Sequence, residues 1–469
     1  MLKTKRLELR SKLVKARLPS RLQPSRQQPG GCGWHGLRFA TLLAVVSFCC
    51  QQHGQAQSLE ELPAGFAVVS GTHIDVITDM PLSDELRQLP RVFDAAMPQW
   101  YEVFDIAQDD LRSNAGLGNI ARPWHVVACV MLDRQRFIDA GLLPTEISTF
   151  QHGFQQGDRL WVSEQPSDYY RRHLLLHEGT HWMMWRKYGS QGPPWLAEGM
   201  AEWMGTHRWN GQELHMGIMP TSRDEVPYWG RTKLIQEQLA TGVAPTLETI
   251  LRYSNTAHQQ TDAYAWSWAA VVFLKYHPDT ADVFAKLLQR SWRTSDEANR
   301  WLFQQLRSRW PEVREQWQET LGDLDYGFDV QRGLRKMSRD VQPLNQPQTL
   351  TVDAADGWQS TGLTVPNGAQ ITIEATGEYI VGQLPQPWRC TPAGVSLEYY
   401  RGQPLGRLMM TTVTPLSREP QFSKPLVVYS VGSGGAFTLI EGGEVLMRIN
   451  ESLGGMADNS GTLRVTIAP

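Results

Sequence analysis

The feature that most constrains this chain is a pair of histidines, His177 and His181, with Glu178 between them. On an α-helix the two histidines lie one turn apart on one face, so two imidazole nitrogens can reach one metal ion. Glu198 and Glu202 follow, again four residues apart. A zinc site that activates water has three protein ligands and leaves a fourth position open. We therefore predict zinc bound by His177, His181 and Glu198, with Glu178 placed to hold a water and Glu202 bracing a ligand histidine.

The flanks of this motif predict two consecutive helices. Residues 169–188 contain no proline and are apolar on nearly all sides, which is typical of a buried helix. Pro193 and Pro194 end this segment, and Trp195 begins the helix with both glutamates. Two alternatives stay open: a core helix with hydrogen-bonded histidines, and a closed structural zinc site, which is normally rich in cysteine. His173 lies one turn before His177, and we expect it not to be a ligand because three ligands are already present.

These residues resemble the gluzincin metallopeptidases, which carry His-Glu-x-x-His on one helix and often Trp-Leu-x-Glu-Gly-x-Ala on the next. The resemblance covers about residues 64–321. It implies an α+β zincin-like domain that hydrolyses peptide bonds, with Glu178 as general base and Glu198 as third ligand. The spacing between His181 and Glu198 is slightly shorter here than in the thermolysin and aminopeptidase branches. Related families often have a tyrosine near the zinc, and Tyr264 is the candidate; it would donate to the oxyanion. The alternative is a buried aromatic whose hydroxyl bonds to the backbone.

Residues 1–56 have the composition of a secretory signal peptide. Ten of the 45 basic residues and one of the 48 acidic residues lie in 1–38, and a short apolar run follows at 39–50. Twelve apolar residues are too few to cross a bilayer, and no later run is longer, so no transmembrane segment is expected in the mature chain. Phe48 fits a lipoprotein signal poorly, so we expect no lipid anchor at Cys49 or Cys50. An exported protein is predicted.

The mature chain would keep 35 basic and 47 acidic residues, a formal charge of −12. This charge argues against nucleic acid or an anionic membrane as partner. Cys129 and Cys390 alone remain after processing; two free, buried thiols are favoured over a disulfide.

Residues 64–170 alternate strand and helix patterns. Strands are expected at 66–72, 73–78, 125–132 and 159–163, and an amphipathic helix at 83–104. Segment 159–163 is a candidate edge strand along a substrate cleft; an ordinary edge strand is the alternative. Residues 195–322 are helical by pattern, with helices expected at 228–239, 264–276, 279–290, 295–310 and 311–321. His207, His215 and His258 are expected on surface loops of this lobe.

The catalytic domain is thus expected at 57–322, followed by a polar, proline-containing linker at 323–348. Residues 349–469 contain short β-forming runs separated by Gly, Pro and Asn, the pattern of a β-sandwich. The loop 449–461 in this domain resembles the calcium loop of small calcium-dependent galactose-binding bacterial lectins. The resemblance implies calcium ligands from Glu451, Asp458, Asn459 and the Gly455 carbonyl, and a carbohydrate partner. Glu451 replaces the lectins' Asp, and an Asp-Asn-Ser-Gly turn also closes hairpins without a metal.

The sequence therefore predicts an exported zinc metallopeptidase with a lectin-like C-terminal domain. Zinc and a peptide or protein substrate are expected, with calcium and carbohydrate as further candidates. A scaffold that binds surface polysaccharide and a zinc amidase of cell-wall glycopeptide are the alternatives. Intact His177, Glu178, His181 and Glu198 favour the enzyme, since a decayed site has no chemical reason to keep the general base.

Overall fold

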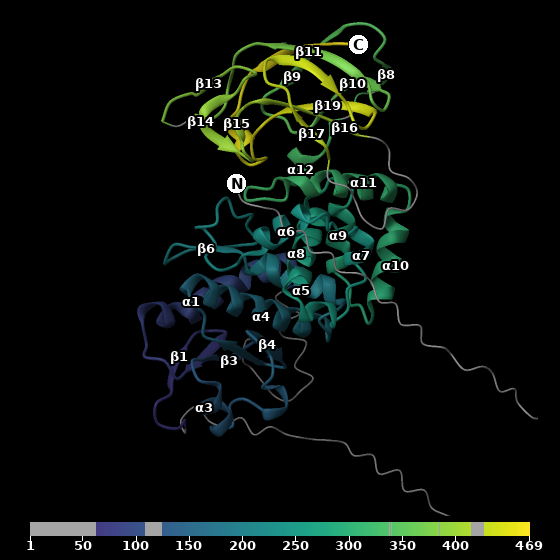
Figure 1. The fold of residues 1–469 in the computed structure, drawn as a ribbon. Coiled ribbons are helices and arrows are strands. Elements are labelled where there is room, and N and C mark those ends of the chain that lie inside the picture. Colours follow the sequence, from purple (N-terminus) through teal and green to yellow (C-terminus); the bar gives the residue numbers. More distant parts are fainter. Residues whose placement is uncertain (1–61, 108–123, 337, 339, 384, 414–425) are drawn as a thin grey trace, which may run out of the picture. The chain divides into compact units, whose positions relative to one another are not determined.

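The computed structural model describes residues 62–107 and 124–469, apart from 337, 339, 384 and 414–425. It contains an α+β region followed by a β-rich C-terminal region (Figure 1). The expected signal peptide, with Cys49 and Cys50, lies outside the described residues. In the described part of the chain, no helix has both the length and the apolar character needed to cross a membrane.

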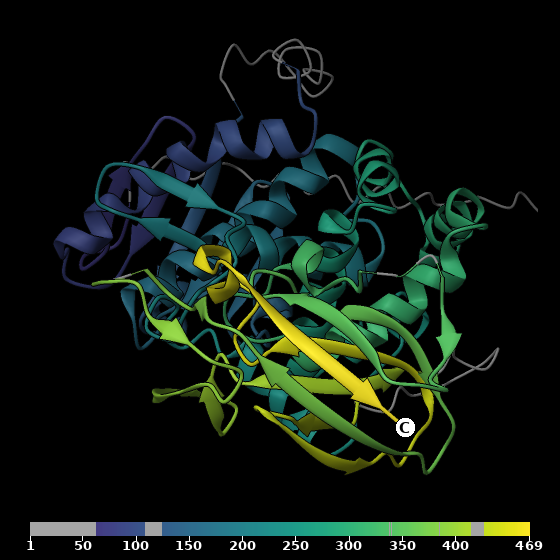
Figure 2. The same ribbon diagram turned by 90° about the horizontal axis from the view of Figure 1, so that it is seen from above.

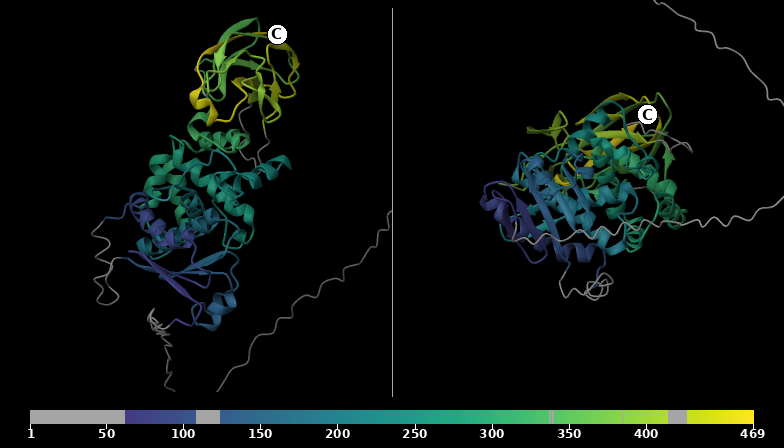
Figure 3. Two further views of the ribbon diagram at one scale, coloured as in Figure 1. Left: turned by 90° about the vertical axis from the view of Figure 1, so that its left-hand side faces the viewer. Right: turned by 90° about the horizontal axis from the view of Figure 1, so that it is seen from below.

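A five-stranded sheet begins the fold, in the order β1-β2-β3-β5-β4. Its purple and blue strands lie together in the left view of Figure 3. β2, β3 and β5 are parallel, and the outer strands β1 and β4 run antiparallel to their neighbours. The strands are β1 (Ala67–Ser70), β2 (Ile74–Thr78), β3 (Val126–Met131), β4 (Gly153–Gln156) and β5 (Arg159–Ser163). The predicted strands at 66–72, 73–78, 125–132 and 159–163 are confirmed, whereas β4 was not predicted.

Two helices share a core with one face of this sheet. They are α1 (Asp84–Val103) and α4 (Asp168–Tyr188), both predicted. α1 begins at Ser83, whose hydroxyl accepts from the Leu86 amide, and its buried stripe includes Phe93 and Trp100. Alternate strand residues such as Ala128 and Leu160 meet these helices, and Cys129 and Trp161 turn to the opposite face, where α3 (Arg134–Asp139) packs. Cys129 and Cys390 are both buried and free.

A helical lobe follows, as the pattern predicted. Its long helices are α5 (Pro194–Gly205), α6 (Arg231–Ala240), α8 (Thr261–Tyr276), α9 (Ala281–Leu288), α10 (Ser295–Leu306) and α11 (Trp310–Thr320). Short elements join them: β6 (His207–Trp209), β7 (Leu214–Met216), α7 (Leu247–Ile250) and α12 (Val330–Gly333). α8 is apolar on nearly every face and packs against α5, because Gly199 of α5 has no side chain: a Cβ there would lie 2.5 Å from the Ser267 carbonyl oxygen.

The C-terminal region consists of open β-sheets (Figure 2). Five strands form one sheet: β17 (Val428–Ser430), β16 (Leu408–Val413), β19 (Gly443–Ile449), β10 (Gln359–Val365) and β8 (Gln342–Pro343). Four form another: β18 (Gly434–Thr438), β11 (Gln370–Thr376), β20 (Thr462–Ala468) and β9 (Gln348–Asp353). Two hairpins complete it: β12 (Tyr379–Ile380) with β13 (Arg389–Cys390), and β14 (Val395–Tyr400) with β15 (Gln403–Leu405). Inward residues of both larger sheets, such as Ile373 and Met447, share one core, as expected of a sandwich.

Segment 323–348 packs against the rest of the protein, unlike an exposed linker. Leu324, Phe328 and Val330 are buried in it. The buried Asp323 accepts two hydrogen bonds from the Arg448 guanidinium of β19, at 2.8 and 2.7 Å. The segment expected as a linker therefore contains buried apolar residues and an ion pair with β19. The segment is polar on average and contains prolines, but a few of its large apolar side chains are buried, and Asp323 belongs to a buried ion pair.

We predict that Asp323→Ala will destabilise the protein by about 3–5 kcal/mol, because it leaves the Arg448 guanidinium buried without its carboxylate. Urea denaturation of the full chain measures this free energy of unfolding. Arg389→Ala is the matched control: its ion pair with Glu378 is exposed, with side chains 80% and 68% accessible, and should contribute about 0–1 kcal/mol. Equal losses in the two variants would contradict the structural role of the Asp323–Arg448 pair.

Candidate metal centre

α4 places the two histidines of the motif inside the protein. The Ser167 hydroxyl accepts from the Tyr170 amide at its start, and Gly189 ends it in the left-handed conformation, with φ 72°. His177 and His181 are each 5% exposed. A buried, rigid helix fixes the direction of both imidazoles, which is what a preformed metal site requires.

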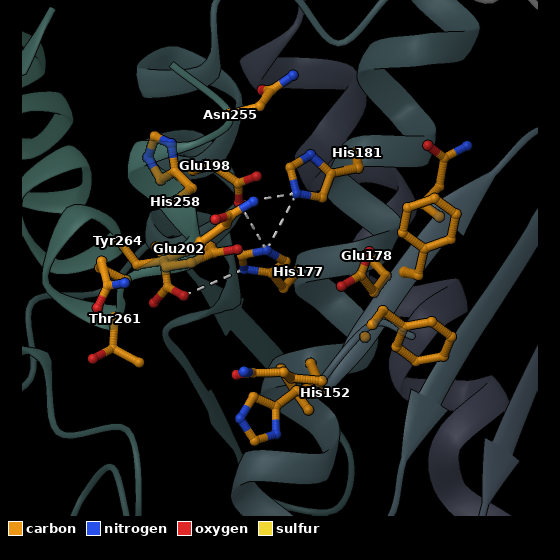
Figure 4. Close-up of a pocket in the computed structure, with 18 of the residues that line it drawn as sticks. His152, His177, Glu178, His181, Glu198, Glu202, Asn255, His258, Thr261 and Tyr264 are labelled. Atoms are coloured by element: carbon orange, nitrogen blue, oxygen red, sulfur yellow. Dashed lines mark hydrogen bonds and ion pairs between the residues drawn. The ribbon is translucent and has the colours of Figure 1, made fainter. Parts of the chain in front are cut away.

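α5 brings Glu198 to these histidines. Pro194 stands at its first position, where a missing amide hydrogen costs nothing, so the helix begins one residue before the predicted Trp195. The Nε2 atoms of His177 and His181 lie 3.2 Å apart. Glu198 Oε2 lies 3.3 Å from each of them. Figure 4 shows the three side chains converging from α4 and α5.

These distances fit a zinc ion. Tetrahedral ligands about 2.0–2.1 Å from zinc lie about 3.3 Å from one another. The three atoms are close to this separation before any metal is considered, and Glu198 Oε2 is buried with no hydrogen-bond donor among the described residues. Two nitrogens and one carboxylate oxygen are ligands that zinc commonly accepts. The residues present therefore fit the group that the sequence predicted.

Glu202 lies behind the histidines, one turn further along α5. Its Oε1 is 3.5 Å from Nδ1 of His177. Arg231 donates to both carboxylate oxygens, at 2.9 and 2.7 Å, and the Trp229 indole donates at 3.1 Å. Burial alone would raise the pKa of Glu202, but Arg231 and His173 outweigh it and hold that pKa well below its usual value. Glu202 is thus an ionised group that faces the outer nitrogen of a candidate ligand.

A second set of candidate ligands, His173, His177 and Glu202, also lies close together. His173 is fully buried, with Nε2 3.5 Å from Glu202. The Arg231 guanidinium already pairs with this carboxylate, so a second cation here would face a buried positive charge. The geometry therefore favours the set with Glu198, and His173 keeps its predicted place outside it.

Glu178 lies beside His177 (Figure 4), and its carboxylate packs against β4. A Cβ at Gly153 of β4 would lie 2.9 Å from Cδ and Cγ of Glu178 and closer still to Oε1. Burial raises the pKa of the Glu178 carboxyl to about 8. The Glu198 carboxyl, by contrast, is held below its usual pKa: burial would raise it, but His181 and His177 lower it by more. The two neighbouring carboxylates therefore have opposite electrostatic environments.

A cleft of about 540 Å³ opens over these side chains. Its walls include His152, Gly153 and Gln155 on the sheet side and His258 and Tyr264 on the helical side. The edge strand along the cleft is β4. The prediction that 159–163 forms an edge strand is wrong, because this segment is β5, which lies between β3 and β4. The four-residue β4 has glycine and glutamine facing the cleft. Its sequence therefore shows neither the apolar run nor the alternation that would predict a strand.

Tyr264 lies at the cleft wall, as its candidate role requires. Its ring centroid is 6.2 Å from that of His177 and 5.2 Å from that of His258. Burial raises the pKa of its phenol, so the hydroxyl keeps its proton at neutral pH. In the described part of the chain, this hydroxyl makes no hydrogen bond to the backbone. The phenol is therefore a hydrogen-bond donor that faces the cleft.

Two of the histidines expected on the surface, His207 and His258, are buried. His258 is 7% exposed and lines the cleft. Its Nδ1 donates to the Ser254 carbonyl at 3.1 Å, so its Nε2 accepts from the Ser267 hydroxyl at 2.9 Å and has no proton to offer a ligand. His207 is buried and stacks on Tyr169, with ring centroids 4.6 Å apart. His215 is exposed, as predicted.

The candidate calcium residues Glu451 and Asp458 line a second cavity of about 430 Å³. Glu451 accepts from the Asn459 amide at 2.7 Å, and Asp458 accepts from the Gln383 backbone amide at 3.1 Å. Gly455 and Trp388 also line this cavity. Burial raises the pKa of Glu451 to about 7, so a cation must displace its proton as well as the bond from Asn459.

Comparisons with known proteins assign neither a family nor an activity to this chain. No protein-family model matches the chain, and no curated protein matches it. Among solved structures, the EclA N-terminal domain, a PllA-like lectin, is 21% identical over 26% of this chain and 93% of that one, with a TM-score of 0.20. A periplasmic inhibitor of g-type lysozyme from Aeromonas hydrophila, PliG, is 9% identical over 29% and 97%, with a TM-score of 0.17. Neither likeness is close enough to assign a fold or an activity.

We predict a strict order of zinc loss among variants of this site. His177→Ala, His181→Ala and Glu198→Gln should lose stoichiometric zinc, because each removes a direct ligand. Glu202→Gln should lower zinc affinity about 10–100-fold, the usual effect of a group behind a ligand. Metal analysis and competition with a chelator measure both. His215→Ala is the control, since this exposed histidine neither lines the cleft nor belongs to either candidate ligand set. Full zinc in either histidine variant, or a larger loss from Glu202→Gln than from Glu198→Gln, would contradict the assignment.

Proposed function

We propose that this protein is an exported zinc metallopeptidase of zincin-like fold. The observation that carries the proposal is the triangle of His177 Nε2, His181 Nε2 and Glu198 Oε2, with sides of 3.2–3.3 Å, beside the general-base candidate Glu178. Zinc bound there supplies a Lewis acid that lowers the pKa of water and polarises the scissile carbonyl. Export is proposed from the composition of residues 1–56.

Within this proposal Glu178 moves the proton. Its carboxylate accepts a proton from the attacking water as the water oxygen bonds to the carbonyl carbon. It then gives that proton to the nitrogen as the carbon–nitrogen bond breaks. The pKa of about 8 describes the buried carboxyl alone, and a nearby dication would favour its ionised form. The Tyr264 phenol would donate to the oxyanion that forms between these two steps.

The substrate strand would pair with β4. The main-chain carbonyl of His152 accepts from the Ser163 amide at 2.8 Å. In an antiparallel pair every second residue bonds to the neighbouring strand, so the residues that bond to β5 alternate from His152 onwards. The main-chain groups of Gly153 and Gln155 therefore point to the free edge of the sheet. An extended peptide laid along that edge would pass directly over Glu178 and the candidate metal ligands.

Gly153 allows us to test the general base without changing it. Gly153→Ala should keep zinc but lower kcat at least about a hundredfold, because the added methyl displaces the Glu178 carboxylate; Glu178→Gln should act in the same direction. The assay is hydrolysis of a mixed peptide library. Gly322→Ala is the control, since a Cβ there meets no atom within 4 Å. Unchanged kcat in Gly153→Ala would contradict the role of Glu178, and zinc without hydrolysis of any peptide would favour the scaffold alternative.

We propose a second role for the C-terminal region: binding of calcium and, with it, a saccharide. The cavity lined by Glu451 and Asp458 supports this role, because the Trp388 side chain lines the same cavity. Carboxylate and amide oxygens suit calcium, and an indole face suits the apolar side of a sugar.

Calcium should therefore raise the melting temperature of the full-length protein. At about a hundred times the dissociation constant the gain is about 2.7 kcal/mol. Asp458→Asn should remove the effect, whereas Glu374→Gln, at an exposed position on β11, should keep it. A melting temperature that ignores calcium in the unchanged protein would contradict the calcium role.

A further inference from the structure

The two ends of the cleft differ. In Figure 4, His152 and Thr261 lie at one end, and Asn255 lies at the other, beside His181. At the first end the sheet-side wall consists of exposed residues, including Gln151 and His152. At the second end the wall is the buried Gln155. A chain lying on β4 therefore has free space in one direction only.

A hydrogen-bonded bridge joins two glutamines that line the cleft at the second end. Gln191, on the loop between α4 and α5, donates through Nε2 to Oε1 of Gln155 at 2.8 Å. Gln155 in turn donates to the Gly157 carbonyl at 2.7 Å, so its side chain is held from both sides. Both glutamines line the cleft. The bridge joins the edge strand to the loop that follows the histidine helix.

The edge strand also ends there. After Gln156 the chain turns at Gly157, whose φ is 56°, and returns as β5. The turn is fixed to α4, because the Trp182 indole donates to Asp158 Oδ1 at 2.8 Å. From Gly153, opposite Glu178, to Gln155 the strand advances about 7 Å, the length of about two residues. A paired substrate can place about two residues between the catalytic groups and the bridge.

We propose that the bridge of Gln155 and Gln191 closes the cleft, so that the protein cleaves peptides within about two residues of a free chain end. The proposal rests on the peptidase function proposed above and adds its substrate class. The bridge acts by exclusion: an internal bond could reach Glu178 only if the chain passed through the space that the two amides occupy.

The test is the position of the first cut in a long peptide with both ends free, read by mass spectrometry. The expected products are single residues or dipeptides. Copies with an acetylated amino end or an amidated carboxyl end show which end is recognised. First cuts at internal bonds, with a kcat/KM comparable to that for terminal bonds, would overturn the closed cleft and leave the peptidase function intact. A zinc-loaded protein that cleaves none of the peptides would overturn both.

Gln191→Ala removes the bridge and keeps the metal site. We expect the ratio of internal to terminal cleavage to rise about tenfold, with zinc content unchanged. Gln156→Ala is the matched control, because this neighbour on β4 is exposed and does not line the cleft. An unchanged ratio in Gln191→Ala would contradict exclusion by the bridge.

Discussion

The candidate metal centre depends on one interaction: the packing of α4 against α5, which holds two imidazole nitrogens and a carboxylate oxygen about 3.3 Å apart in the protein interior. Burying such groups without partners is unfavourable, because each loses its bonds to water. Surrounding contacts maintain the arrangement. Gly199 lets α8 approach α5, and Glu202, which accepts from Arg231, lies 3.5 Å from the outer nitrogen of His177. A cation bound by the three atoms would satisfy them, which is why metal binding and the stability of this region should be coupled.

The proposed proton transfer by Glu178 would depend on a different contact, between a helix and the edge of a sheet. Glu178 leaves α4 beside the candidate ligands, but its environment is set by β4, where Gly153 leaves room for the carboxylate. One helix therefore presents the candidate metal ligands and the proposed proton acceptor in adjacent directions. The same strand continues to Gln155, so the element that positions the proton acceptor also limits the length of the cleft.

The centre of the site was predictable from the sequence because helical geometry relates His177 to His181 and Glu198 to Glu202 by spacing alone. The helices and the longer strands followed from apolar periodicity. What sequence could not supply was contact between distant segments. β4 is too short and too polar to be read as a strand, and His258 is buried only because its loop folds over α8 to reach Ser267. In the same way, the ion pair of Asp323 with Arg448 joins residues 125 positions apart in the chain.

We propose that this chain binds zinc through two imidazoles and a carboxylate. X-ray absorption at the zinc edge of the purified protein tests this proposal most directly, because scattering from the first coordination shell distinguishes nitrogen and oxygen from sulfur. We expect nitrogen and oxygen ligands at about 2.0–2.1 Å, imidazole scattering from two histidines and no sulfur. Sulfur at about 2.3 Å, or a purified protein that holds no zinc when zinc is supplied, would contradict it.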